Sequence, residues 1–165
     1  MFNLLFGNLC SLLAMATDSV SASRKDSRGV LIWQSVSQVI YGVGTLALKG
    51  YSGAVQNAVS LLRNIAAICN FTHPALQWAL VILGVVWGLA CNNLGLVGLL
   101  PVVANLEYTL AIFRFQNNER ALKTAFMVCV FLFVLFNLAI LNIVGALSNL
   151  VVFLSTGFFL LRTRK

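Results

Sequence analysis

The sequence predicts an all-α polytopic membrane protein with seven transmembrane helices, arranged as two parallel three-helix bundles joined by a linker helix. The first observation is composition: 60% of the 165 residues are hydrophobic, 9% are charged, and the mean hydropathy is +0.93. So little charge cannot cover a surface that faces water, so lipid must be the solvent. The second is that the apolar segments have about the 20 residues that cross the hydrocarbon of a bilayer. The third is an internal repeat.

Seven apolar segments follow one another, at about residues 2–20, 30–49, 54–71, 76–92, 95–114, 121–141 and 144–161. The first ends in SVSA, which resembles a signal-peptidase site, but no Lys or Arg precedes its apolar run, so we expect a transmembrane helix. The other six follow, in order, the turns SRKDSRG, KGYSG, THPAL, CNNLG, RFQNNER and LNIVG. These turns are polar or contain Gly or Pro, as connections between antiparallel helices do. Helix is expected because lipid offers no partner to a free backbone group.

Basic residues gather after the first segment, around the turn between the fifth and sixth, and in the tail. These places hold nine of the eleven Lys and Arg residues; Lys49 and Arg63 are the exceptions, while Asp18 and Asp26 are interpreted as balancing the first turn. With seven spans the three places share one side, and short loops rich in Lys and Arg stay cytoplasmic. We therefore expect the N-terminus outside and the C-terminus in the cytoplasm. The net charge of +7 is explained in this way without a nucleic-acid partner.

The repeat joins GAVQNAVSLLRN at residues 53–64 to GALSNLVVFLST at residues 145–156, at an offset of 92 positions. Gap-free matches of Gly and Asn indicate a duplication. Residues 1–71 would form the first three-helix bundle, residues 72–93 the linker helix and residues 94–165 the second bundle. Three spans and one linker keep the copies parallel, a plan in which transporters bind their solute near the membrane midplane between the repeats.

A resemblance to a known family is visible in the turn SRKDSRG and in LKGYSGAVQNAVSLLRN. The chain resembles the YgjV-type family of bacterial inner-membrane proteins over nearly its whole length. Its 3+1+3 layout looks like the SWEET-type (PQ-loop type) fold of sugar facilitators and PnuC vitamin transporters. The resemblance implies a multi-pass protein of the bacterial inner membrane. A departure is that the paired prolines of the sugar facilitators are missing: Pro101 opens the fifth helix and the first helix contains no proline.

Polar residues inside apolar segments are the candidate solute contacts, because each costs free energy unless it is paired. Three of them, Asn57, Ser60 and Asn64, share one helical face at spacings i, i+3 and i+7. The predicted substrate-binding residues are Asn57, Ser60, Arg63, Asn64, Trp87, Asn105, Glu107 and Asn149. Further polar residues of the same helices and of the second helix are Gln34, Ser37, Gln38, Tyr41, Gln56, Tyr108 and Ser148.

Several of these residues have two interpretations. Arg63 either forms a structural ion pair with Glu107 or binds an anionic group of the solute, and snorkelling toward the headgroups is a third possibility. Asn57 and Asn149 either bind the solute or join helices. Trp87 lines either a pocket or an interfacial belt. Glu107 is the deepest acidic residue and therefore the candidate for proton coupling.

No catalytic or metal-binding pattern occurs. His73, the only histidine, sits in a turn before Pro74 without a carboxylate or cysteine partner, and the four cysteines lack metal-ligand spacing and are expected to be small buried hydrophobic residues. We expect no enzyme activity, cofactor or metal. The expected function is a transporter or facilitator for a small polar solute, in the bilayer, as a monomer or homo-oligomer. Alternatives are a non-transporting binding or receptor subunit of the same fold and, third, lipid handling.

Overall fold

The computed structural model describes residues 1–23, 27–71, 73–115 and 119–162. Within these ranges the chain forms seven helices and no strand. The helices are α1 (Phe2–Ser23), α2 (Ser27–Ala47), α3 (Tyr51–Ile68), α4 (Pro74–Ala90), α5 (Leu96–Arg114), α6 (Glu119–Ala139) and α7 (Ile143–Arg162). The all-helical fold class is confirmed, and the helices follow the order that the apolar segments predict.

Two helices have both the length and the hydropathy of a membrane span, Phe2–Ser21 within α1 and Ile143–Arg162 in α7. Shorter apolar helices are Pro74–Ala90, Leu96–Ala111 and Lys123–Ala139. In α3, polar residues lower the hydropathy, but they are turned inward. The polar residues that α3 buries are Ser52, Gln56, Ser60 and Asn64. These buried polar residues are a physical reason for the low hydropathy of α3.

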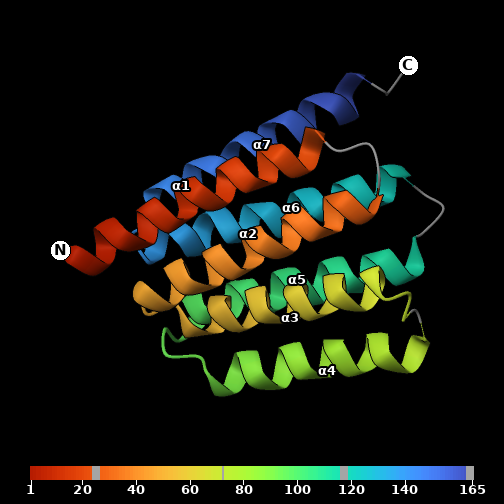
Figure 1. The fold of residues 1–165 in the computed structure, drawn as a ribbon, viewed down its shortest axis with the longest axis horizontal. Helices are drawn as coiled ribbons and strands as arrows, with labels where there is room; N and C mark the ends of the chain where they lie inside the picture. The colour runs from red at the N-terminus through yellow and green to blue at the C-terminus, as the bar shows by residue number, and fades with distance from the viewer. Residues whose placement is uncertain (24–26, 72, 116–118, 163–165) are drawn as a thin grey trace.

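Helices that are neighbours in sequence also pack side by side. α2 lies between α1 and α3, and α6 lies between α5 and α7. The ends of these two groups meet, because α1 contacts α7 and α3 contacts α5 (Figure 1). α4 lies at the edge of the bundle against α3 and α5, and the start of α1 and the end of α7 lie at opposite ends of the bundle (Figure 1).

The turn before α3 and the turn before α7 have the same backbone conformation. Lys49 and Leu141, which are 92 positions apart, both adopt a left-handed φ, of 60° and 59°. Such an angle is uncommon for residues other than glycine. Four backbone hydrogen bonds around Lys49 recur around Leu141 at the same offset, and α2 and α6 begin and end 92 positions apart. The backbone therefore repeats at the offset at which the sequence repeats.

The start of α4 and the place of Pro101 differ from the sequence prediction. α4 begins at Pro74 because the preceding His73 caps it, with Nδ1 accepting a hydrogen bond from the amide of Ala75 at 3.2 Å. Proline suits this position, since the first amides of a helix have no partner within it. α5 begins at Leu96, so Pro101 lies inside the helix, and the expectation that it opens the helix is wrong.

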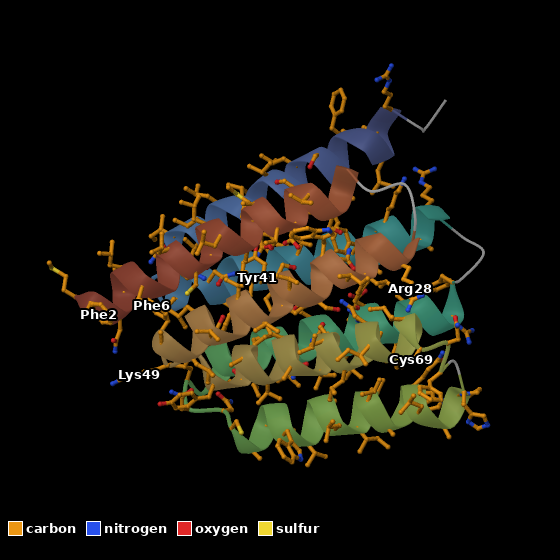
Figure 2. All side chains as sticks on the ribbon, in the orientation of Figure 1. Phe2, Phe6, Arg28, Tyr41, Lys49 and Cys69 are labelled. Carbon is orange, nitrogen blue, oxygen red and sulfur yellow. The ribbon has the colours of Figure 1, made fainter. Side chains whose placement is uncertain are left out.

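The basic residues that the structure describes separate along the bundle. Figure 2 shows Lys49 at the end that carries the N-terminus and Arg28 at the opposite end. The other basic residues of the first turn and the tail, except Arg162, lie outside the described residues. The expectation that all four cysteines are buried is half wrong: the buried pair is Cys10 and Cys129, and the exposed pair is Cys69 and Cys91.

The helices α3 and α7, which contain the repeated stretch, are preceded by different residues. Gly50 precedes α3, and Asn142 precedes α7. Asn142 is 1% exposed; its Oδ1 accepts a hydrogen bond from the amide of Gly145 at 3.1 Å, and its Nδ2 donates to Oδ1 of Asn137 at 2.9 Å. We expect Asn142→Ala to lower the free energy of unfolding by about 1 kcal/mol, because this cap is lost. Thermal unfolding in detergent measures the change. The exposed Asn3→Ala is the control, and equal losses in both variants would contradict the cap.

Candidate functional site

A cavity of about 150 Å³ lies between α3, α4 and α5. A cavity of about this volume admits a molecule of the size of benzene. Most of its wall is aliphatic, and its polar lining residues are Gln56, Ser60, Arg63, Gln77, Asn105 and Thr109. The helices α3 and α5 belong to different halves of the chain. A solute in this cavity would therefore touch both halves and also α4.

Gln56 joins the three helices around the cavity. Its Nε2 donates a hydrogen bond to the carbonyl of Gly84 in α4 at 2.8 Å, and its Oε1 accepts one from Nδ2 of Asn105 in α5 at 2.9 Å. The side chain is 1% exposed. α4 approaches this closely because Gly84 and Gly88 lack side chains, and a Cβ on Gly88 would lie 2.5 Å from Nε2 of Gln56. Gln56 therefore holds the wall of the cavity together.

Arg63 lines the cavity, and among the residues that the structure describes it makes no ion pair with Glu107. Its electrostatic neighbours are Tyr108 of α5 and Cys129 of α6. Oε2 of Glu107 is buried and has no hydrogen-bond partner within the described residues. The Arg63 guanidinium, which has no carboxylate partner among the described residues, is therefore the positive group of the cavity.

The structure gathers only part of the predicted site. The predicted contacts that line the cavity are Ser60, Arg63 and Asn105. Those absent from its lining are Asn57, Asn64, Trp87, Glu107 and Asn149. The side chains of successive residues in a helix point in directions about 100° apart. Gln56 therefore reaches α4 and α5, whereas its neighbour Asn57 lies against Gly42 of α2.

Trp87 lies on a different face of the molecule. It is 59% exposed and lines an open apolar groove of about 570 Å³ between α3 and α4, together with Tyr51 and Leu62. An exposed apolar surface of a membrane protein meets acyl chains or another apolar protein surface. Trp87 is not among the residues that line the polar cavity.

Three polar residues escaped the sequence analysis as site candidates, namely Gln77 and Thr109, which line the cavity, and Asp18. Gln77 lines the cavity from α4, and its signal was a polar side chain inside an otherwise apolar segment that was interpreted only as a linker. Asp18 was assigned to the first turn, but its carboxyl group interacts with the hydroxyls of Ser37 and Tyr41 on α2. No group of three or more His, Cys, Asp or Glu side chains suited to a metal ion occurs in the described part of the chain.

The family model Imp-YgjV, described as a bacterial inner membrane protein, matches residues 5–165. No curated protein and no solved structure matches the chain. The matched range includes all seven helices except the first residues of α1, and therefore the whole cavity.

Proposed function

We propose that this chain, which belongs to the Imp-YgjV family of bacterial inner membrane proteins, carries a small polar solute across the membrane and binds it in the cavity between α3, α4 and α5. The observation that carries the proposal is the guanidinium of Arg63 in that cavity, without an ion pair to Glu107 among the described residues. An arginine inside a membrane protein needs a counter-charge or water. A solute with an anionic group, no larger than about benzene, would supply this charge.

The proposed architecture is seven spans in two parallel three-helix units with α4 as the linker, as in the SWEET-type fold. The recurring turn before α3 and α7 and the contacts of α1 with α7 and of α3 with α5 support it. Rocking of one unit against the other would open the cavity toward either side in turn. We place the N-terminus outside and the basic ends in the cytoplasm, and the proposal includes no catalytic step and no cofactor.

A second candidate is a non-transporting binding subunit of the same fold. The open groove lined by Tyr51, Leu62 and Trp87 favours it, because this apolar surface suits a partner helix in the membrane. The solute would then bind in the same cavity without crossing.

A thermal-unfolding screen of the purified protein tests the proposal, with carboxylates and other small anions no larger than about benzene as candidate solutes. A bound solute raises the midpoint by mass action. Val81→Phe, which fills the cavity from α4, should abolish the increase, and Trp87→Phe, outside the cavity, should preserve it. Entry of the same compound into liposomes supports transport, binding without entry supports the subunit, and a blank screen of folded protein contradicts both.

A further inference from the structure

A second polar cluster lies where α1, α2 and α7 meet, apart from the cavity. The carboxyl group of Asp18 on α1 interacts with the hydroxyls of Ser37 and Tyr41 on α2, and the Tyr41 hydroxyl interacts with Ser148 on α7. Ser37 is fully buried, and the other three are half-buried. Figure 2 shows Tyr41 well inside the bundle, away from the labelled residues at its two ends. Three helices thus direct oxygen atoms at one another.

This cluster corresponds to the surroundings of Arg63 in the other part of the repeat. Ser37, beside Asp18, and Cys129, beside Arg63, are 92 positions apart on α2 and α6. Ser148 is in turn the equivalent of Gln56. The place on α1, α2 and α7 therefore carries the carboxyl group of Asp18, and the corresponding place on α3, α5 and α6 carries the guanidinium of Arg63. At the offset of 92 the equivalent of Arg63 is Ser155, so the acid at the corresponding place comes from α1 and not from the repeated stretch.

The hydrogen bonds of the cluster allow two states that differ by one proton. Oγ of Ser37 donates a hydrogen bond to the carbonyl of Gln34 at 2.9 Å, and the same hydroxyl interacts with the carboxyl group of Asp18. A protonated Asp18 can donate to that oxygen without disturbing it. A deprotonated Asp18 can accept from the hydroxyl of Tyr41, which in turn can accept from Ser148. Both states leave every hydroxyl of the cluster with a partner.

No cation among the described residues pairs with this carboxyl group. From α2, Tyr41 is the titratable group that interacts with it, and from α7 the cluster receives only the uncharged Ser148. Arg28 and Arg162, at the ends of those two helices, are exposed. The charged residues of the neighbouring turn that lie outside the described residues are Arg24, Lys25 and Asp26. A proton can supply the positive charge that neutralises Asp18 in these surroundings.

We propose that Asp18 is the proton-binding site of this protein, and that its proton couples movement of the solute to a pH gradient. The inference rests on the proposed function. One proton from the aqueous phase converts the carboxylate to the acid, and the reverse step releases it on the other side. A proton at Asp18 and an anion at Arg63 make a neutral pair, which the membrane potential does not oppose. The sequence candidate, Glu107, lacks a hydroxyl partner for its buried Oε2 in the described residues.

Infrared difference spectroscopy of the full chain in liposomes, between acidic and alkaline buffer, tests the proton site directly. The carbonyl band of a protonated carboxyl group should appear in the wild type and in Glu107→Gln, the matched control, and be absent in Asp18→Asn. Ser37→Ala should shift the band, because the acid loses its acceptor. A band that survives in Asp18→Asn, or a wild type without a band, would overturn the assignment. Tyr41→Phe provides a second variant if Asp18→Asn does not fold, and it too should shift the band.

Uptake of labelled pyruvate, a carboxylate smaller than benzene, tests the coupling. With the membrane potential clamped, the wild-type accumulation ratio should rise about tenfold for each pH unit when one proton accompanies each solute. Asp18→Asn should lose this accumulation but keep pyruvate binding and the exchange of labelled for unlabelled pyruvate. Accumulation that persists in Asp18→Asn would refute the coupling. A wild type that does not bind pyruvate counts against the proposed function for this class of solute, and the infrared band still decides the role of Asp18.

Discussion

Replacing Arg63 by glutamine should weaken the binding of an anionic solute by about ten- to a hundredfold. A hydrogen bond to a charged group contributes about 1.5–3 kcal/mol, which corresponds to this range of Kd. The folded protein should keep its stability, because no ion pair between Arg63 and Glu107 is lost in the described residues. A titration that follows the midpoint of thermal unfolding against solute concentration measures both quantities.

Two further arginine variants make this result specific. Arg28→Gln removes the same charge from an exposed position at the end of the bundle and should leave the affinity unchanged. Arg63→Lys keeps the charge but loses the planar pair of donors, so an intermediate loss is expected. If Arg63→Gln unfolds the protein, or if its affinity equals that of Arg28→Gln, the guanidinium is structural and the proposed site is wrong.

Gly53→Ala should lower the stability of the helix bundle. The ring of Phe136 on α6 covers Gly53, and an added Cβ would lie 2.7 Å from Cζ of that ring. Phe136 is 1% exposed, so surrounding side chains oppose its displacement. Overpacking of this kind costs about 1–3 kcal/mol. Reversible unfolding in mixed detergent micelles measures the loss.

The control is a helical glycine with free space. A Cβ on Gly42 would lie 3.7 Å from Cβ of Asn57, an ordinary contact, so Gly42→Ala should be neutral or slightly stabilising. Combining Gly53→Ala with Phe136→Leu should recover part of the loss, because the two changes act on one contact. A double variant no more stable than Gly53→Ala would rule out the ring as the cause.

For much of the candidate site, the sequence predicted which polar residues lie inside apolar segments but not which of them come together. Ser60, Arg63 and Asn105 were predicted and do line one cavity. Asn57 and Asn149 were selected because they repeat, but neither lines the cavity. A repeated residue occupies an equivalent position in the two parts of the repeat. A cavity whose walls carry different residues need not contain such a residue.

The sequence by itself determined the helical fold class, the number and order of the helices and the offset of the repeat. This was possible because lipid allows few backbone conformations, so apolar length and polar turns define each element. Only the tertiary structure decided which polar groups meet: Gln56 with Asn105, Asp18 with Tyr41, and Arg63 apart from Glu107. Helical periodicity assigns a residue to a face, but the rotation of that face toward a distant helix follows from side-chain packing across the bundle.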